Sequence, residues 1–318
     1  MFNEIKLINL VTGGAGFIGS HLINSLLKKN EEIICIDNFL TGSHVNLKKW
    51  RLNKNFTFIN HDIVNPIDLK VNKIWHLACP ASPIHYQKNP IYTSKILFQG
   101  TLNVLNIAQK NNAKLLLASS SEIYGDPESH PQDESYFGNV NNIGIRSCYE
   151  EGKRMAESLC YDFQRERNIK LRIARIFNTY GPGMLINDGR VISNFVCQAL
   201  QKKSLTIYGD GSQTRSFCYI SDMIRGLIKL MDSDYNKPMN IGSEMEMKII
   251  DLARLVKENT YPNLKINFNP SIKDDPIKRK PNIDVAKNVL KWNPTVDIQS
   301  GLLLTIDYFK KEIGKNNL

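Results

Sequence analysis

The feature that most constrains this chain is a glycine-rich turn near its start, TGGAGFIG at residues 12–19. A short β-branched apolar run, KLINLVT at 6–12, precedes the turn, and residues 20–29 follow it with helical spacing. Gly13, Gly16 and Gly19 are therefore expected at a strand-to-helix turn, where the backbone can approach a pyrophosphate and the helix N-terminus offers unpaired N–H groups. Glycine triplets also mark tight turns that bind nothing, so a second signal is needed.

The second signal is Asp37, which ends the next apolar run, EEIICIDN at 31–38, and lies 18 residues after Gly19. A carboxylate at this place can accept a hydrogen bond from an adenosine ribose 2′-hydroxyl and would repel a 2′-phosphate. The two signals together predict NAD rather than NADP as the cofactor. Asp62 and Ile63, at the end of the third apolar run, are placed to flank an adenine, although Asp62 could equally cap a helix.

Apolar runs alternate with helical segments along the first half of the chain, which predicts an α/β fold with a doubly wound parallel (Rossmann) sheet. The further expected strands are 56–62, 73–79, 114–121 and 171–178, and the expected helices lie near 90–111 and 147–167. After residue 179 this rhythm breaks, with a helix expected at 190–203, a return to the first domain at 217–242, and helices around loops at 243–318. We therefore predict a smaller discontinuous C-terminal region: an NAD-binding domain of residues 1–179 plus 217–242, and a substrate-binding region of 180–216 plus 243–318.

Composition excludes several classes of protein. Hydrophobic residues make up 42% and charged residues 23%, as in an ordinary globular protein, and no apolar run approaches the roughly 20 residues that span a membrane. The segment Met1–Glu4 has no basic n-region, so a cytoplasmic protein is expected. The net charge of +10 comes from lysines interleaved with acids, which argues against nucleic-acid binding. Six scattered cysteines without a CxxC pair predict core or near-site thiols and no metal site.

A candidate catalytic pair lies in SCYEEGKRM, where Tyr149 and Lys153 are four residues apart on a predicted helix and so share one face. A tyrosine with its ordinary pKa of about 10 is a poor base at neutral pH. A nearby ammonium and a positive nicotinamide ring are expected to lower that pKa. Tyr149 could then take a proton from a sugar hydroxyl while a hydride leaves for NAD.

Several longer strings add to these features: DNFLTG, HLACPASPIHYQ, SSSEIYGDP, NVNNIGIRSCYEEGKRMAE, ARIFNTYGP, NDGRV, YGDGSQTRSFCY and DDPIKRKPNI. With them, the chain from about residue 6 to residue 312 resembles the extended short-chain dehydrogenase/reductase family that acts on nucleotide sugars, and within it the UDP-glucuronate decarboxylases. The resemblance implies a UDP-sugar substrate, NAD-dependent loss of CO2 through a 4-keto intermediate to give UDP-xylose, and NAD regenerated in each cycle. It also implies a homodimer formed through a four-helix bundle of the helices near 90–111 and 147–167.

The resemblance assigns catalytic roles to Tyr149, Lys153, Ser120 and Glu122. The cofactor contacts that it implies, with the glycine turn and Asp37 included, are Gly13, Gly16, Phe17, Ile18, Gly19, Asp37, Asn38, Phe39, Thr41, Gly42, Asp62, Ile63, Leu77, Tyr149 and Lys153. The substrate contacts are Arg190, Arg215 and Arg279, with Asn178 and Lys95 closer to the sugar. Arg279 is the candidate for holding a substrate carboxylate, because the guanidinium fork suits carboxylate oxygens.

The stretch SSSEIYGDP at 119–127 contains one carboxylate next to the predicted site, Glu122. Related dehydratases carry an Asp-Glu pair at the positions of Ser121 and Glu122, because they must protonate a departing hydroxyl and also abstract a proton. A departing CO2 needs no such acid, so Ser121 favours decarboxylation. We hypothesise that Glu122 handles the proton added at C5 of the sugar, through a water.

Some positions depart from the family pattern. Ser120 replaces a usual threonine and keeps the hydroxyl, and Gly183, Asn142 and Ile96 also differ. Of these, Gly183 and Ile96 bear on fine substrate preference, including the nucleotide base. Two competing functions stay open: a nucleotide-sugar 4,6-dehydratase or 4-epimerase on the same scaffold, and a non-catalytic NAD(H)-sensing protein. The presence of both Tyr149 and Lys153 argues against the NAD(H)-sensing protein.

Overall fold

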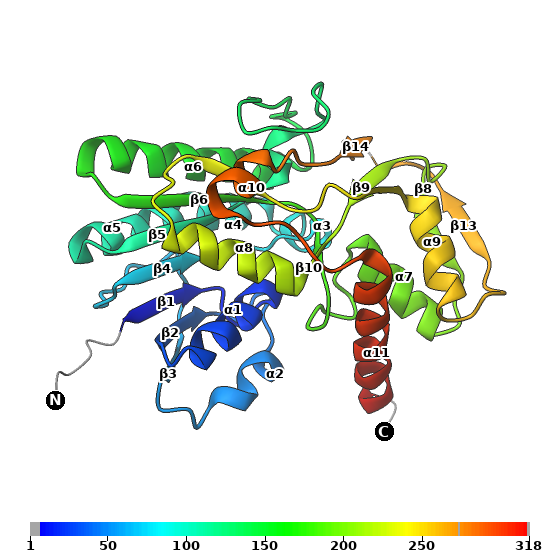
Figure 1. Cartoon of the computed structure of the whole chain (residues 1–318), viewed down its shortest axis with the longest axis horizontal. Helices are drawn as coiled ribbons and strands as arrows, with labels where there is room; N and C mark the ends of the chain where they lie inside the picture. Colours follow the sequence, from blue (N-terminus) through cyan, green and yellow to red (C-terminus); the bar gives the residue numbers. More distant parts are fainter. Residues whose placement is uncertain (1–6, 273, 317–318) are drawn as a thin grey trace.

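The computed structural model describes residues 7–272 and 274–316. Its centre is a seven-stranded sheet with the order β11-β6-β5-β4-β1-β2-β3, in which all neighbouring strands are parallel (Figure 1). The strands are β1 (Ile8–Thr12), β2 (Glu32–Asp37), β3 (Phe56–Asn60), β4 (Lys73–His76), β5 (Lys114–Ser120), β6 (Lys170–Ile176) and β11 (Pro238–Ile241). The predicted doubly wound parallel sheet is confirmed, and the return of the chain after residue 217 supplies its last strand.

The sheet is buried on both faces because its strands are almost continuously apolar. Side chains alternate along each strand, so Leu10 of β1 packs into one core layer and Val11 into the other. Helices α1 (Phe17–Lys28) and α8 (Ile220–Asp232) cover one face. Helices α5 (Thr101–Asn111) and α6 (Ser147–Arg167) cover the opposite face (Figure 1).

The strand order places the candidate site. The chain winds outward in both directions from β1, to β2 and β3 on one side and to β4, β5 and β6 on the other. In such sheets ligands bind outside the carboxyl ends of the strands, where the order reverses. The residues at or just beyond these ends include the glycine turn after β1, Asp37 at the end of β2, and Ser120 at the end of β5.

The helices differ from the sequence expectations in detail. Helix α1 begins at Phe17, three residues before the expected start, because the last glycine of the turn already lies inside the helix. The helix expected near 90–111 is α4 (Pro90–Lys95), a π-helical turn η2 (Ile96–Gly100) and then α5. Helix α6 matches the expected 147–167.

The remaining chain builds a smaller region at the carboxyl edge of the sheet, with the long helix α11 (Ile298–Asn316) beside α7 (Val191–Leu200) (Figure 1). Segment 243–318, expected to hold helices around loops, also contains short strands. The sequence does not predict these strands, because they pair with strands further back in the chain and carry little apolar pattern of their own. Strands β12 (Glu246–Lys248) and β14 (Lys278–Arg279) flank β9 (Thr214–Ser216), and β13 (Ile266–Asn269) pairs with β8 (Leu205–Tyr208). The other elements are α2 (His44–Leu47), η1 (Lys48–Trp50), α3 (Pro83–Tyr86), η3 (Ser121–Tyr124), β7 (Thr179–Tyr180), β10 (Cys218–Tyr219), α9 (Ile249–Glu258) and α10 (Asp284–Leu290).

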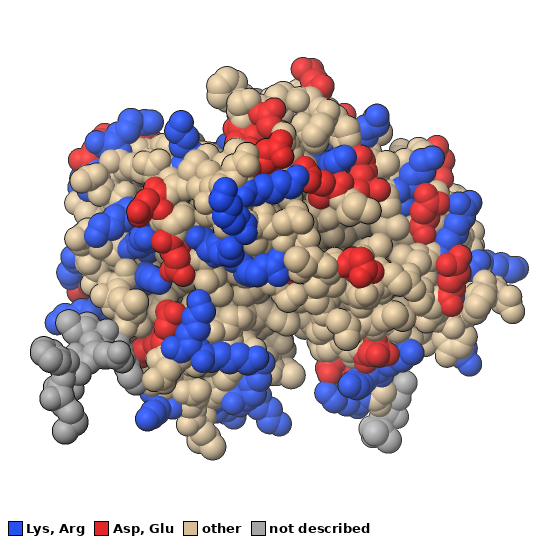
Figure 2. All heavy atoms as spheres, in the orientation of Figure 1, with Lys and Arg blue, Asp and Glu red and all other residues tan. Residues whose placement is uncertain are grey.

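On the face drawn in Figure 2, Lys and Arg side chains are interspersed with Asp and Glu. Among the described residues, no helix has the length and apolar character that crossing a membrane requires. Residues 1–4, on which the expectation of a cytoplasmic protein rests, lie outside the described residues.

Candidate active site

The glycine turn between β1 and α1 has a backbone that side chains would disrupt. Gly13 has φ +72°, and a Cβ there would lie 2.8 Å from the backbone of Ala78. A Cβ on Gly19 would lie 2.4 Å from the carbonyl oxygen of Gly13. Gly16 is the N-cap of α1 and makes no side-chain capping bond, so the first N–H groups of this helix can bind a phosphate.

Asp37 lies beside this turn with its carboxylate held by the backbone. Its Oδ2 accepts from the Ala15 N–H at 3.0 Å, and its Oδ1 accepts from the Phe39 N–H at 2.8 Å. Burial raises the pKa of Asp37, and these two N–H donors oppose that shift. Each carboxylate oxygen keeps a second lone pair, so Asp37 can still accept from a ribose hydroxyl.

Asp62 and Ile63 follow β3 and line the same cleft. Asp62 Oδ1 accepts from the Val64 N–H at 3.0 Å, and Oδ2 accepts from the Tyr92 hydroxyl. Residues 63–65 form a turn, so no helix begins there for Asp62 to cap. Asp62 thus stabilises a turn and binds Tyr92, and the position of the pair beside an adenine stays a prediction.

Tyr149 and Lys153 lie on one face of α6, and both are buried against the end of β5. The Tyr149 ring stacks on Tyr86 with centroids 4.9 Å apart and planes 11° apart. Lys153 Nζ lies 5.7 Å from the Tyr149 ring centroid and donates to the Ala118 carbonyl at 2.6 Å. The Ser120 hydroxyl is hydrogen-bonded to Tyr149 and also accepts from the Glu122 N–H at 3.2 Å.

The groups of the chain itself raise the pKa of Tyr149 on balance. Burial raises the pKa of Tyr149, with Cys79 adding to the rise, and the hydrogen bond from Ser120 opposes it. Burial also lowers the pKa of Lys153, against the effect of Cys79 and Glu157. A lowering of the pKa of Tyr149 would therefore need the positive nicotinamide ring of bound NAD in addition to the Lys153 ammonium, since both favour the phenolate.

Glu122 lies between two arginines that are far away in sequence. Arg279 donates to Glu122 Oε1 at 2.6 Å and to Oε2 at 2.9 Å, and Arg146 also donates to Oε2. Burial alone would raise the pKa of Glu122, but Arg279 and Arg146 hold it at about 2, below its ordinary 4.5. Glu122 is therefore a carboxylate at neutral pH, and it can accept hydrogen bonds but has no proton to donate.

A second ionic group lies next to Glu122 and its two arginines, on the side of the smaller region. Arg215 donates to Asp275 at 2.8 Å, and Arg146 approaches the other oxygen of Asp275 at 3.6 Å. Burial lowers the pKa of Arg215, and Asp275 opposes this shift. The three arginines thus converge on one end of the cleft, which suits an anionic ligand.

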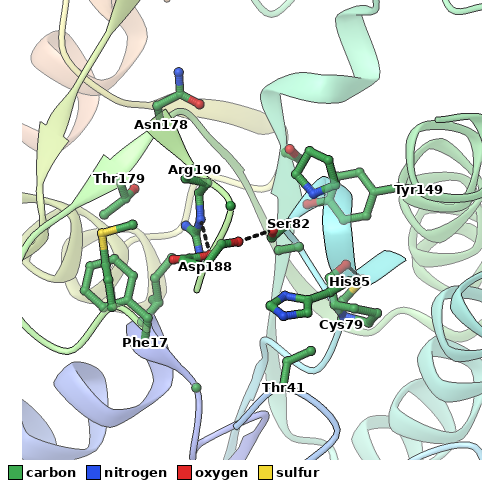
Figure 3. Close-up of a pocket in the computed structure, with 18 of the residues that line it drawn as sticks. Phe17, Thr41, Cys79, Ser82, His85, Tyr149, Asn178, Thr179, Asp188 and Arg190 are labelled. Carbon is green, nitrogen blue, oxygen red and sulfur yellow. Dashed lines mark hydrogen bonds and ion pairs between the residues drawn. The ribbon is translucent and has the colours of Figure 1, made fainter. Parts of the chain in front are cut away.

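Arg190 lies at the opposite wall, near the glycine turn. Its Nε donates to Asp188 at 3.0 Å, and its guanidinium lies 5.9 Å from the ring centroid of Phe17 (Figure 3). The Asp188 carbonyl in turn accepts from the Ser82 hydroxyl. Figure 3 shows Tyr149 facing this group across the cleft.

All these groups line one cleft of about 530 Å³ that runs from the glycine turn to the arginines. This volume lies within the range of small-molecule sites, roughly 300–1,000 Å³. The uncapped glycine turn, the Asp37 carboxylate and the Tyr149–Lys153 pair supply what a dinucleotide needs: phosphate, ribose and nicotinamide contacts in that order. The residues present therefore fit NAD.

Comparison with known proteins agrees with this geometry. The profile of the NAD dependent epimerase/dehydratase family matches residues 9–242. The chain belongs to this family. A UDP-glucuronic acid decarboxylase of Arabidopsis thaliana (decarboxylase 6) is 53% identical over 98% of this chain and 92% of its own length. A UDP-glucuronic acid decarboxylase of Xenopus tropicalis (decarboxylase 1) is 51% identical over 96% of this chain and 72% of its own length.

Among solved structures, a UDP-glucuronic acid 4-epimerase of Bacillus cereus, in complex with UDP-glucuronic acid and NAD, has a TM-score of 0.87 and 30% identity. The match covers 96% of this chain and 100% of the epimerase chain. The resemblance that the sequence strings indicate is thus confirmed, and so is NAD as the cofactor of the family.

The cleft gathers most of the residues that the sequence singles out for this family site. Those that line it are Gly13, Gly16, Phe17, Ile18, Gly19, Asp37, Asn38, Thr41, Asp62, Ile63, Leu77, Ser120, Glu122, Tyr149, Lys153, Asn178, Arg190, Arg215 and Arg279. Three others do not line it. Phe39 stacks its ring on His44, at a centroid distance of 3.6 Å, and a Cβ on Gly42 would lie 2.9 Å from Asp37 Oδ1.

The third, Lys95, is exposed at the end of α4, and its neighbour Ile96 lines the cleft instead. The Lys95 side chain is thus turned to solvent at this point of the helix. Its placement near the sugar stays a prediction.

Sequence reasoning missed Arg146, Asp275 and Asp188, which complete the ion pairs of the cleft. It also missed Tyr86, which supports the Tyr149 ring. A signal for Arg146 was present, because Arg146 and Glu150 are four residues apart at the start of α6 and form an ion pair at 2.8 Å. All six cysteines are free thiols, with Cys79 and Cys148 near the site and the others buried.

Proposed function

We propose that this protein is a UDP-glucuronate decarboxylase, which converts UDP-glucuronate into UDP-xylose and CO2 and regenerates NAD in each turnover. One observation carries the proposal: Arg279 and Glu122 meet at 2.6 Å in the cleft that Tyr149 lines, and Ser121 adds only a hydroxyl beside them. A cation is thus available for the uronate carboxylate, and no acid is present at Ser121 to expel a hydroxide. The decarboxylases at 51–53% identity support this interpretation.

The first step is oxidation at C4 of the sugar. NAD, which the glycine turn, Asp37 and the Tyr149–Lys153 pair would hold, would supply the hydride chemistry at C4 when bound. Tyr149 takes the proton of the 4-hydroxyl as general base, and Lys153 stabilises the phenolate through its ammonium. Ser120, hydrogen-bonded to Tyr149, keeps the phenol oxygen directed at the substrate.

The second step is loss of CO2. The 4-ketone makes the sugar a β-keto acid, because the carboxylate on C5 is one carbon away from the ketone carbon. The C5–C6 bond breaks, its electron pair moves into an enolate, and the former C4 oxygen carries the charge. The hydroxyl groups of Tyr149 and Ser120 donate to that oxygen, as in an oxyanion site.

The third step is protonation at C5, and here Glu122 acts through a water. With a pKa of about 2, Glu122 holds no proton of its own at neutral pH, but it can accept from a water and orient it. The water gives one proton to C5, and the hydroxide that is left takes up a proton from solvent. Glu122→Gln should therefore slow solvent-deuterium incorporation at C5 more than it slows the oxidation step. Unchanged turnover together with unchanged deuterium incorporation would remove this role from Glu122.

The nucleotide end of the substrate is assigned to the smaller region. Arg215 is proposed to bind the diphosphate, with Asn178 facing the sugar. Arg190 is proposed to contact phosphate as well, and its position over Phe17 brings it close to the glycine turn. The cofactor contacts are proposed to be the lining residues of the turn and of the ends of β2, β3 and β4.

The runner-up function is a UDP-glucuronic acid 4-epimerase, and the likeness to the Bacillus cereus structure favours it over a 4,6-dehydratase. Such an enzyme also oxidises C4 but releases no CO2. Incubation of the purified protein with UDP-glucuronate, UDP-glucose and dTDP-glucose in turn separates the functions, with Tyr149→Phe as the inactive control. Formation of a UDP-pentose from UDP-glucuronate, with no turnover of the other two sugars, supports the proposal. Formation of UDP-galacturonate from UDP-glucuronate would show a 4-epimerase instead.

We also propose the domain division of residues 1–179 plus 217–242 and 180–216 plus 243–318. The pairing of β11 with β6 supports the return of the chain to the first domain. Within the second part, Trp292 packs on α8 and donates to the Asp222 carbonyl at 3.1 Å, so the two parts share a tight interface.

A homodimer through the helical segment 90–111, which comprises α4, η2 and α5, and through helix α6 is a further proposal. The segment contacts α6, and together they expose Ile91, Phe98 and Met155, which are 83%, 45% and 49% exposed. Paired apolar helix faces of this kind favour a four-helix bundle. A monomer by light scattering at micromolar concentration would contradict it. The six free thiols fit a reducing compartment, and we propose the cytoplasm.

A further inference from the structure

Behind the catalytic pair lies a buried carboxylate that does not line the cleft. Glu157 lies on α6, four residues after Lys153 and eight after Tyr149, so the three side chains share one face of the helix. Glu157 is 7% exposed. Burying a carboxylate costs free energy unless it is paired, so its partners need an explanation.

The contacts of Glu157 tie α6 to the end of β5. The Ser119 hydroxyl donates to Glu157 Oε1 at 2.5 Å. Ser119 stands between Ala118, whose carbonyl accepts from Lys153 Nζ at 2.6 Å, and the catalytic Ser120. Glu157 therefore fixes the three-residue segment that positions both Lys153 and Ser120.

Arg175 of β6 holds Glu157 from the other side, with Nε to Oε1 at 3.1 Å and Nη2 to Oε2 at 2.9 Å. The Arg175 guanidinium also donates to the Tyr124 hydroxyl at 3.0 Å. The other titratable groups near Glu157 are Cys160, Tyr161 and Lys153, and burial keeps both the Cys160 thiol and the Tyr161 phenol neutral by raising the pKa of each.

The groups around the Lys153 ammonium are Glu157 on its own helix, Tyr149, and His76 and Cys79 at the end of β4. Burial lowers the pKa of His76 to about 3 and raises the pKa of Cys79 to about 11, so both are neutral at neutral pH. Burial also keeps Tyr149 neutral in the chain by itself. Among these groups Glu157 is the one that carries an opposite charge.

We propose that Glu157 is a positioning residue of the reaction: it supplies the counter-charge that keeps Lys153 an ammonium, and through Ser119 it holds that ammonium against β5. The proposal rests on the catalytic roles given to Tyr149 and Lys153 above. It assigns a function to Glu157 and Arg175, which do not line the cleft, and to Ser119, which lines the cleft beside Ser120.

The test measures the titration of Lys153 directly, in protein labelled at the lysine ε-carbons and without substrate, with the resonance assigned from Lys153→Met. Glu157→Gln keeps the hydrogen-bonding shape and removes the charge, so the pKa of Lys153 should fall by about one unit or more. In the active enzyme the alkaline limb of kcat should move to lower pH by the same amount. Ser119→Ala is the matched control, because it removes the hydrogen bond and leaves the charge, and it should leave the titration in place.

An unchanged pKa of Lys153 in Glu157→Gln overturns the proposal, and so does an equal shift in Ser119→Ala. If Glu157→Gln fails to fold because Arg175 is left unpaired, the double variant Glu157→Gln/Arg175→Gln removes both charges and should still lower the pKa of Lys153. A lowered pKa in a protein that does not decarboxylate UDP-glucuronate would keep this inference and reject the proposed function.

Discussion

Arg279 should discriminate uronic acids from other nucleotide sugars, and its contribution can be worked out from its pairing. The side chain is 5% exposed and makes two charge-assisted hydrogen bonds to Glu122, at 2.6 and 2.9 Å. A substrate carboxylate that shares or replaces Glu122 would make a similar bidentate pair. Hydrogen bonds to charged groups contribute about 1.5–3 kcal/mol each. The substrate must displace part of the contact between Arg279 and Glu122, which reduces the gain. Arg279→Ala should therefore weaken the binding of UDP-glucuronate by about 3 kcal/mol, or roughly 150-fold in Kd.

The assay is calorimetric titration of UDP-glucuronate and of UDP into Arg279→Ala, made in a Tyr149→Phe background so that the substrate is not consumed. UDP has no carboxylate, so its Kd should hardly change. Arg215→Ala is the matched control, since it removes a cation at the proposed diphosphate and should weaken both ligands alike. Equal losses for UDP and UDP-glucuronate in Arg279→Ala would refute the reasoning.

Three further outcomes are expected. Glu122, with a pKa of about 2 against an ordinary 4.5, binds fewer protons folded than unfolded, so its stabilisation is complete above pH 4.5 and is lost as the pH falls toward 2. The stability difference between the wild type and Glu122→Gln in urea should therefore be up to about 3 kcal/mol at neutral pH and shrink by about pH 3, whereas a constant difference would contradict the pairing. Gly19→Ala forces a Cβ to 2.4 Å from the Gly13 carbonyl oxygen, so it should lower the free energy of unfolding by about 2 kcal/mol and also weaken NAD binding. In the control Gly314→Ala the added Cβ has nothing within 4 Å, so the free energy of unfolding should rise by up to about 1 kcal/mol. Asp37→Ala should weaken the binding of NAD and strengthen the binding of NADP, as measured by fluorescence titration. An unchanged preference for NAD would contradict the place of Asp37 at the ribose.

The cofactor half of the site was predictable from the sequence because its signals are local. The glycine turn, Asp37 and the Tyr149–Lys153 spacing each depend on one strand end or one helix face, and the structure brings them together at the carboxyl edge of a parallel sheet. The apolar runs that predict the strands are also local, since the strands other than the edge strand β3 are largely buried on both faces.

The substrate half was less predictable, because it depends on contacts between distant segments. The clamp of Glu122 with Arg279 joins residues 157 positions apart, and no spacing rule indicates such a pair. The neighbours Lys95 and Ile96 show a related limit, because a motif names adjacent residues and leaves open which of them lines the cleft; here it is Ile96. The short strands β12, β13 and β14 escaped detection because two to four residues with little apolar pattern carry no periodic signal.

The central claim is most directly tested by incubating the purified protein with UDP-glucuronate and NAD, while CO2 release is followed and the sugar product is identified by NMR. The account predicts one CO2 for each UDP-xylose formed, with no net accumulation of NADH. Turnover of UDP-glucuronate without CO2, or turnover of UDP-glucose or a dTDP-sugar in its place, would contradict it.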